Sequence, residues 1–227
     1  MIYILHGDDI VTSRKKLSEL TSEFKSVTYL DAEKIGNTDI VQTLSSSDLF
    51  LDKKCIVIEK ILKLPKKELD ALLELVDSFD SSITLILWNN TELSKVFLGK
   101  FKDATIESFI LPKLFFTFLD NLSPNSVSQE IELLSRMVNV EAEQIFYAMI
   151  KRIRNMLMIK SNSNSDDLTK MSPWQLGKIK EQSLKWKVEE LEKIYKDLFD
   201  LEVKMKSGGL MLPLKKHLDI LLVQAIN

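Results

Sequence analysis

The sequence contains few of the residues on which protein chemistry usually depends. Among 227 residues there is one cysteine, Cys55, so no disulfide bond forms within the chain. Cys55 stands in the apolar run CIVI, where a small buried hydrophobe is expected. The two histidines, His6 and His217, have no Cys, His or Glu neighbours at the spacing of a zinc site. We therefore expect neither a metal nor a cofactor.

Long apolar runs and an excess of basic residues are also absent. No stretch of the sequence approaches the roughly 18 apolar residues that span a bilayer. The acidic pair in MIYILHGDD comes too early for a signal peptide, so a cytoplasmic protein is expected. The formal net charge is −2, whereas a protein that binds nucleic acid through bulk charge is usually clearly basic. Any DNA contact should be local or shared with partners.

Residues 1–111 alternate short apolar runs with segments that carry apolar residues at helical spacing. The expected strands are Ile2–Leu5, Ser26–Leu30, Cys55–Glu59, Ile83–Trp88 and Thr105–Ile110. The expected helices between them are Thr12–Glu23, Thr38–Ser45 and Lys66–Asp77. Strands that alternate with helices predict an α/β domain with a mostly parallel sheet.

Residues 112–227 contain only helical patterns. The expected helices are Lys113–Leu122, Val127–Val138, Glu141–Lys160, one that begins at Pro173, one with an apolar stripe from Val188 to Leu201, and Leu214–Ala225. Ser126 with Gln129, and Ser172 with Gln175, have the spacing of capping boxes. These patterns predict an α/β domain of residues 1–111 followed by an all-α domain of residues 112–227.

The turn after the first strand argues against a nucleotide site. A P-loop needs G-x-x-x-x-G-K-[ST] at this place, but the sequence is HGDDIVTSRKK, with one glycine and two acids. No G-x-G-x-x-G occurs, and no G-x-S-x-G elbow. Asp8 and Asp9 are either metal ligands or a turn and helix N-cap, and the second interpretation is favoured. The domain is therefore expected to lack a nucleotide site and the chain to lack enzymatic activity.

Two groups of side chains in the helical half have alternative interpretations. Lys151, Arg152 and Arg154 form either a solvated face or a contact with nucleic-acid phosphates or an acidic partner. Trp174, Trp186 and Tyr195 are expected to be core aromatics rather than platforms on which bases stack.

The segment SSSDLFLDKKCIVIEK places three apolar residues, Leu49, Phe50 and Leu51, beside a turn at the entry to a strand. Three such neighbours cannot all point into one core. They either cover the end of the sheet or form an apolar tip that enters a pocket of a partner. A Leu and a Phe moved from water into a pocket each contribute about 1.5–3 kcal/mol, which is enough for a small hot spot.

Several segments, in order along nearly the whole chain, resemble one protein family. They are YILHGDD, SSDLFLDKKCIVIEK, LILWNNTELSK and the tail WQLGKIKEQSLKWKVEELEKIYKDLFDLEVKMKSG. The sequence resembles the delta subunit of the bacterial DNA polymerase III clamp loader. The resemblance implies an AAA+-like front domain that has lost its nucleotide site.

The resemblance also implies roles for residues and partners. Leu49 and Phe50, with Leu51 as a third candidate, would form a wedge that enters an apolar pocket of the sliding clamp and favours an opened ring. The C-terminal helices would join a collar with ATPase and delta-prime type subunits. ATP would act through those neighbours, and primed DNA would be reached indirectly.

One feature departs from this family. Its members usually carry a helical lid domain between the sheet domain and the collar, but here Ile110-Leu111-Pro112 leads almost directly into a helix of the expected collar. This puts the usual geometry of the loader in doubt.

Two other functions remain open. One is a helical nucleic-acid-binding module fused to a degenerate nucleotide-binding fold, which would carry a continuous basic stripe. The other is a small-molecule enzyme, which would need convergent polar groups at the carboxyl ends of the strands. The candidates there are His6, Asp8, Asp9, Asp31 and Asn89-Asn90.

Overall fold

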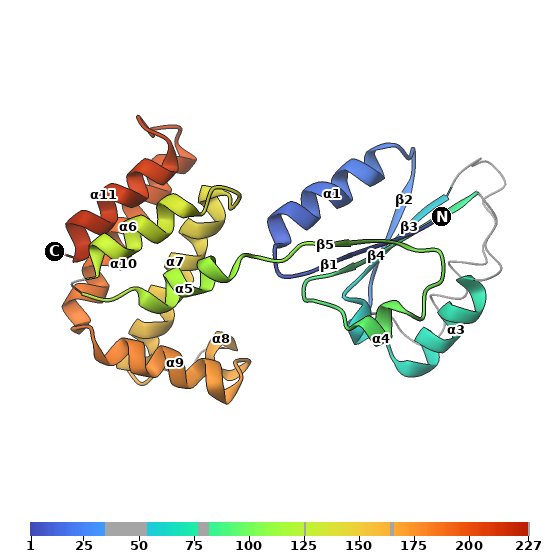
Figure 1. Cartoon of the computed structure of the whole chain (residues 1–227), viewed down its shortest axis with the longest axis horizontal. Coiled ribbons are helices and arrows are strands. Elements are labelled where there is room, and N and C mark those ends of the chain that lie inside the picture. Colours follow the sequence, from blue (N-terminus) through green and yellow to red (C-terminus); the bar gives the residue numbers. More distant parts are fainter. Residues whose placement is uncertain (35–53, 77–81, 125, 164–165, 227) are drawn as a thin grey trace. The chain divides into compact units, whose positions relative to one another are not determined.

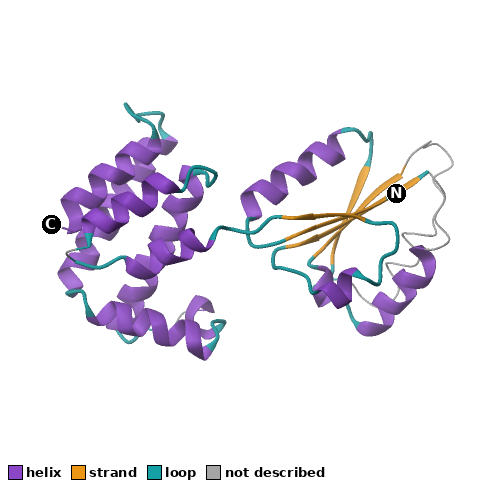
Figure 2. Ribbon diagram, viewed as in Figure 1, coloured by secondary structure: helices purple, strands orange, loops and turns teal. Residues whose placement is uncertain are grey.

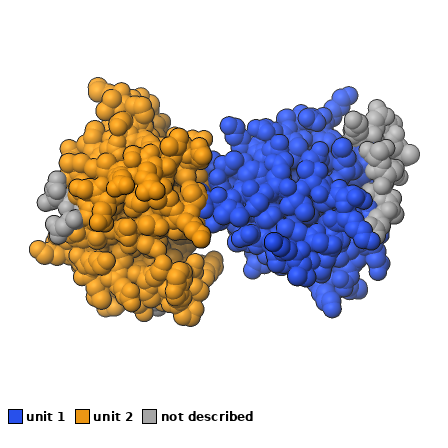
Figure 3. Space-filling view, in the orientation of Figure 1, with its two compact units in different colours: residues 1–111 blue, residues 112–227 orange. Residues whose placement is uncertain are grey.

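Strands and helices are segregated along the chain. The structure, a computed structural model, describes all residues except 35–53, 77–81, 125, 164–165 and 227. Two compact units, Met1–Leu111 and Pro112–Asn227, make up the chain (Figure 3). Every strand of the described residues lies in the first unit, and the second is built from helices (Figure 2). The predicted fold class, α/β followed by all-α, is confirmed.

A five-stranded sheet forms the centre of the first unit. Its strands are β1 (Ile2–His6), β2 (Val27–Asp31), β3 (Lys54–Glu59), β4 (Ile83–Asn89) and β5 (Thr105–Ser108). They lie in the order β2-β3-β4-β1-β5, and each neighbouring pair is parallel. The predicted strands are confirmed, although β5 ends two residues earlier than expected. Cys55 to Ile58 are 0% exposed, because both faces of a parallel sheet are covered.

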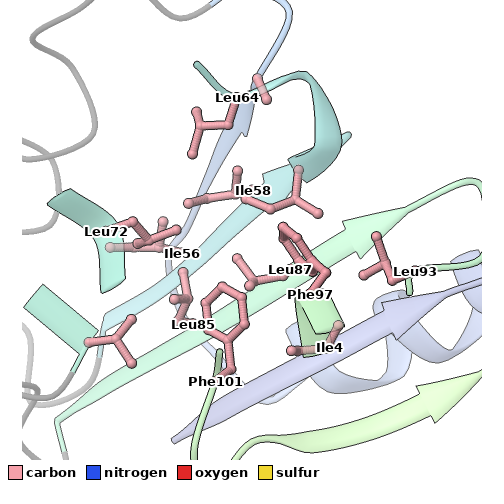
Figure 4. Close-up of a cluster of buried hydrophobic side chains, with 13 residues drawn as sticks. Ile4, Ile56, Ile58, Leu64, Leu72, Leu85, Leu87, Leu93, Phe97 and Phe101 are labelled. Atoms are coloured by element: carbon pink, nitrogen blue, oxygen red, sulfur yellow. The ribbon is translucent and has the colours of Figure 1, made fainter. Parts of the chain in front are cut away.

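Helices cover both faces of the sheet (Figure 1). On one face α1 (Ile10–Ser22) buries Leu17 against Cys55, Val57 and Ile86. The other face is covered by the 3₁₀ helix η1 (Ile61–Lys63), α3 (Lys66–Val76) and α4 (Lys95–Leu98). Figure 4 shows this second cluster, in which Ile56, Ile58, Leu72, Leu85 and Phe97 are labelled. The sequence pattern did not predict η1 or α4, and the expected helix Thr38–Ser45 lies outside the described residues.

The second unit packs around one long helix. Its helices are α5 (Lys113–Asn121), α6 (Val127–Arg136), α7 (Ala142–Lys160), α8 (Asp166–Thr169), α9 (Pro173–Leu184), α10 (Val188–Lys206) and α11 (Leu214–Ile226). The central helix α7 contacts α5, α9, α10 and α11. One side of α7 is apolar and faces the core, because Ile145, Met149, Ile153 and Met156 are buried. Only four residues separate β5 from α5. Nowhere in the described chain is a helix long and apolar enough to cross a membrane.

The two expected capping boxes have different outcomes. Ser172 and Gln175 form one at the start of α9, where the Gln175 amide donates to Ser172 Oγ over 3.3 Å and the Ser172 amide donates to Gln175 Oε1 over 3.1 Å. The prediction of a box at Ser126 with Gln129 is wrong. The Ser126 hydroxyl donates to the carboxylate of Glu130 instead, because Glu130 turns inward.

Glu130 is a fully buried carboxylate on α6, with 0% of the residue exposed. Its Oε1 accepts hydrogen bonds from Ser126 Oγ and, over 3.2 Å, from the Ser123 amide. Its Oε2 has no partner among the described residues. Burial raises the pKa of Glu130 above its ordinary value, although the two hydrogen bonds act in the opposite direction. The folded state therefore favours the protonated form of this group.

We expect Glu130→Gln to stabilise the protein at high pH and to have little effect at low pH. Because the folded-state pKa is raised, the stabilisation from Glu130 is present below its unfolded pKa and is lost as the pH rises through the folded pKa. A neutral amide avoids the buried charge and still accepts the Ser123 hydrogen bond. The expected gain at pH 8 is about 1–3 kcal/mol. Urea unfolding followed by circular dichroism from pH 4 to pH 8 measures it.

Glu132→Gln on the same helix is the matched control, because the Glu132 side chain is 70% exposed and pairs with Arg136 at 3.7 Å. Its effect should be small and nearly independent of pH. A Glu130→Gln variant whose stability follows the parent's at every pH would contradict the assignment of Glu130 as a buried, destabilising charge.

Candidate functional site

The predicted wedge residues Leu49, Phe50 and Leu51 lie outside the described residues, but the structure describes how their segment is attached. Lys54 begins β3 three residues after Leu51, and its amide donates to the Ser82 carbonyl over 2.9 Å. Before the segment, the Ala32 amide donates to the Glu59 carbonyl over 3.0 Å. Ala32, before the segment, is therefore bonded to the end of β3, and Lys54, after it, is the first residue of β3, a strand that is buried at its centre.

An ion-pair cluster strengthens the attachment on the Ala32 side of the segment. Lys60 Nζ contacts Asp31 Oδ2 at 3.1 Å and also pairs with the carboxylate of Glu33. Lys60 has a left-handed backbone with φ of 58°, which directs its side chain across the end of β2. The hydrogen bonds to Glu33 and Asp31 raise the pKa of Lys60, so it stays charged.

The turn between β1 and α1, where a phosphate loop would lie, is closed by the chain itself. Gly7 has φ of +133°, and a Cβ at this position would be 1.8 Å from the Phe109 carbonyl oxygen. The Asp9 amide donates to the same carbonyl over 3.0 Å, and the Phe109 amide donates to the His6 carbonyl over 2.7 Å. The segment after β5 therefore occupies the space beside the turn, which leaves no wrapping loop of amides for a phosphate.

The two acids of this turn have structural partners. Asp8 Oδ1 accepts a hydrogen bond from the Leu111 amide over 2.7 Å. Asp9 caps α1 and accepts from the Thr12 amide over 3.0 Å and the Thr12 hydroxyl over 2.8 Å. The interpretation of this pair as a turn and N-cap is confirmed. Within the described parts of the chain, no group of three or more His, Cys, Asp or Glu could hold a metal ion.

Other polar groups at the carboxyl ends of the strands also bond internally. His6 Nδ1 accepts from the Leu93 amide over 3.2 Å, and burial lowers the pKa of His6, so the imidazole stays neutral at pH 7. Asn89 Nδ2 donates to Thr91 Oγ1 over 2.8 Å. Both groups therefore bond to the segment that follows β4.

Arg14 joins α1 to the ends of two strands. Its guanidinium forms a bidentate ion pair with Glu59 at the end of β3 and stacks on Trp88 of β4, 3.7 Å from the ring centroid. Trp88 Nε1 donates to the buried Ser13 hydroxyl over 3.2 Å. These contacts hold the first turns of α1 against the sheet beside the closed turn.

The basic cluster on α7 is neutralised within its own unit. Arg152 pairs with Asp120 at 3.0 Å and donates to Gln182 Oε1 over 3.1 Å, and its side chain is only 15% exposed. Arg154 pairs with Asp167, and Lys151 lies 3.9 Å from the same carboxylate. Arg152 thereby ties α7 to α5 and α9. A contact of the cluster with DNA or a partner stays a prediction, and Lys151 is the most exposed of its members.

The structure exposes a surface that the sequence pattern did not identify. We use the name α9 surface for the outward side of α9 with Trp174, Gly177, Lys178, Lys180 and Leu184. Trp174 is 68% exposed and Tyr195 of α10 is 36% exposed, so their interpretation as core aromatics is wrong, whereas Trp186 is 2% exposed and belongs to the core. Lys178 Nζ lies 4.3 Å from the centroid of the Trp174 ring and 2.8 Å from Asp120.

Two further properties of the α9 surface are unusual. Gly177 lies within the helix, yet a Cβ there would have no heavy atom within 4 Å, so internal packing does not require glycine. The segment 151–187 has nine Lys or Arg but only three Asp or Glu, in a chain whose net charge is −2. This local imbalance is the sequence signal that could have identified the surface.

Two glycine substitutions test these environments. Gly7→Ala should destabilise the protein by at least about 2 kcal/mol, because the new Cβ collides with the Phe109 carbonyl and the backbone has positive φ. Gly177→Ala should stabilise it by up to about 1 kcal/mol, because alanine favours helix and meets no neighbour. Chemical denaturation of both variants measures the difference. Equal tolerance of alanine at Gly7 would contradict the close contact with Phe109.

Comparison with known proteins gives structural neighbours only. No protein-family model and no curated protein matches the chain. A DNA clamp loader delta protein of Bacillus subtilis is 11% identical, with a TM-score of 0.48, over 99% of this chain and 95% of that chain. A DNA polymerase III gamma subunit-related protein of Thermotoga maritima is 17% identical, with a TM-score of 0.40, over 99% and 93%. The RuvB Holliday junction branch migration motor of Thermotoga maritima is 15% identical, with a TM-score of 0.40, over 99% and 79%. At TM-scores below 0.5 these likenesses carry no argument about function, which must come from the chain's own residues.

Proposed function

We propose that the chain is a non-catalytic delta-type subunit of a clamp loader, which binds the DNA sliding clamp and helps to open it. The observation that carries this proposal is the closed turn between β1 and α1. Ligands of open parallel α/β sheets bind at the carboxyl ends of the strands, and here Phe109 and Leu111 are bonded to that turn. A parallel sheet whose β1–α1 turn is filled by its own chain suits a protein that binds other proteins and performs no chemistry on a nucleotide.

The proposed clamp-binding residues are Leu49 and Phe50, with Leu51 beside them. They belong to the segment that joins β2 to β3. Ala32 on one side of it bonds to the end of β3, and Lys54 on the other side is the first residue of β3 and bonds to Ser82. A connecting segment held by a rigid scaffold is a common place for a binding contact. The family resemblance of SSDLFLDKKCIVIEK supports the same assignment.

Other clamp-loader subunits are proposed to bind the C-terminal helices. The outward side of α11 supports this, because Ile220 and Val223 are each 42% exposed although they lie on a helix that is otherwise packed through Leu218 and Leu222. ATP would then be hydrolysed by those neighbours and would act on this chain through them.

The double variant Leu49→Ala, Phe50→Ala should lose clamp binding. Removing two side chains that together contribute about 3 kcal/mol or more from an apolar pocket weakens binding about 100-fold or more. Surface plasmon resonance with the sliding clamp of the same organism measures this, with binding by the parent expected in the micromolar range or tighter.

The double variant Ile10→Ala, Val11→Ala is the matched control. These two neighbouring apolar residues of the first unit are 44% and 45% exposed, so their loss removes similar apolar surface elsewhere. This control should bind the clamp as the parent does. If the Leu49→Ala, Phe50→Ala variant retained its helix content and bound the clamp with the affinity of the parent, the wedge assignment would be wrong.

A second function, contact with single-stranded nucleic acid, is favoured by one observation: Trp174 is exposed, and Lys178 Nζ lies 4.3 Å from the centroid of its ring. An aromatic ring at the surface of a positively charged face is the arrangement on which unpaired bases stack. Gly177 leaves the helix bare next to the ring, which permits close approach of a strand. Because Lys180 and Lys185 are exposed on the same helix or at its end, phosphates would find cations nearby. This contact is compatible with the delta-type role.

Trp174→Ala should weaken the binding of a fluorescently labelled oligo(dT) by about 5- to 150-fold, the loss that corresponds to one stacked base. Trp174→Phe should retain most of the affinity, because a ring remains. Fluorescence anisotropy at two salt concentrations measures both variants, and binding should weaken as salt increases.

Trp88 and Trp186 supply an internal control, because they are 3% and 2% exposed. Oligonucleotide should therefore quench the intrinsic fluorescence through Trp174, and Trp174→Phe should remove the quenching. If Trp174→Ala bound oligo(dT) with the affinity of the parent, stacking of a base on Trp174 would be excluded, and a contact with another protein would be the remaining role for its exposed ring.

A further inference from the structure

Helix α10 has two apolar faces, and only one of them is covered. Leu191, Ile194, Leu198 and Leu201 are buried in the unit, where α10 packs on α7 and α11. On a neighbouring side Tyr195, Phe199 and Val203 are 36%, 59% and 50% exposed. Successive members are four residues apart, so they form one row along the helix. We use the name α10 stripe for these three residues together with Glu192 and Lys206.

The α10 stripe is symmetric about Phe199. Tyr195 and Val203 lie four residues before and after it, and Glu192 and Lys206 lie seven residues before and after it. Seven residues are close to two helical turns, so both charged residues lie on the same side of the helix as Phe199. The order along the row is therefore acidic, apolar, apolar, apolar, basic. Reversal of the row exchanges the two charges, so the row is complementary in charge to its own antiparallel copy.

We propose that the α10 stripe is a self-association surface, on which a second copy of this chain packs its own α10 in antiparallel orientation around a two-fold axis at Phe199. In this arrangement Tyr195 of each copy meets Val203 of the other, and Glu192 meets Lys206. A two-fold interface uses the same patch on both copies, which is the property that the symmetric row provides. The inference does not depend on the proposed function, because it uses neither the wedge nor the α9 surface.

The charged residues at the ends of the row are available for such pairs. Lys206 pairs with Glu202 at 2.7 Å on its own helix, but its side chain is 67% exposed, so a change of partner costs little. Glu192 is exposed as well. The pairs therefore select the antiparallel register more than they add affinity.

The size of the surface indicates a weak dimer. The row from Glu192 to Lys206 is about 21 Å long, and contact along one helix lies at the low end of the range for specific interfaces. We expect a dissociation constant on the order of 10–100 µM.

Charge reversal tests the register. Glu192→Lys alone should weaken self-association about tenfold, because each of the two symmetric contacts then brings the introduced ammonium group toward Lys206. Lys206→Glu alone should act in the same way. The double variant Glu192→Lys, Lys206→Glu should restore self-association to within about threefold of the parent, because the pairs re-form with opposite sign. Sedimentation velocity over a range of concentrations of the whole chain measures all four proteins.

Apolar substitutions supply the control. Phe199→Asp should abolish self-association, whereas Leu184→Asp should leave it unchanged, since Leu184 is 79% exposed on α9 and lies off the row. Circular dichroism shows whether each variant keeps its helices. A parent that stays monomeric at every concentration, or a double charge reversal that fails to restore association, would overturn the proposal. A monomeric parent whose Phe199→Asp variant loses affinity for another subunit would instead identify the stripe as an interface between different chains.

Discussion

The contact between Gly7 and the Phe109 carbonyl is the constraint on which the first unit depends. β1 lies between β4 and β5, so its carboxyl end is the place where a ligand of this kind of sheet would bind. Hydrogen bonds from Asp9 and Leu111 draw the chain after β5 against that end and fill it. The acids that would repel a phosphate are those that cap α1 and hold Leu111. A single turn therefore holds Phe109 and Leu111 against the carboxyl end of β1.

The contacts at the carboxyl ends of the strands also matter for the binding of a partner. The internal bonds of His6, Asn89 and Arg14 hold the carboxyl ends of the strands in place. Rigidity is useful to a binding protein, because a contact segment held at both flanks loses less conformational entropy when a partner binds. The segment between β2 and β3 has this kind of attachment, through the Ala32 amide and Lys54. The second flank is β3 itself, a strand whose central residues are buried.

Features that follow from local pattern could be predicted from the sequence, and features that depend on distant contacts could not. The runs around Ile4, Ile56 and Ile86 identified strands because a parallel sheet buries both faces, which leaves an apolar signature. Ser126 had the spacing of a capping box, but burial of Glu130 diverted its hydroxyl. Arg152 had the periodicity of a solvated residue, and only the fold brings it to Asp120, 32 residues away in the sequence. The wedge residues are in a segment that the structure does not describe.

The exposed Trp174 shows why net charge was a poor guide to the surface. At physiological ionic strength a charge is screened beyond about 8–10 Å, so a bound strand responds to the residues near it rather than to the whole chain. The net charge of −2 for the whole chain therefore says little about residues 151–187, which contain nine basic and three acidic residues. Several of those basic residues are already paired, as Arg152 is with Asp120, so a local count also overstates the available charge. What distinguishes the α9 surface is the exposed indole ring of Trp174, with Lys178 Nζ 4.3 Å from its centroid.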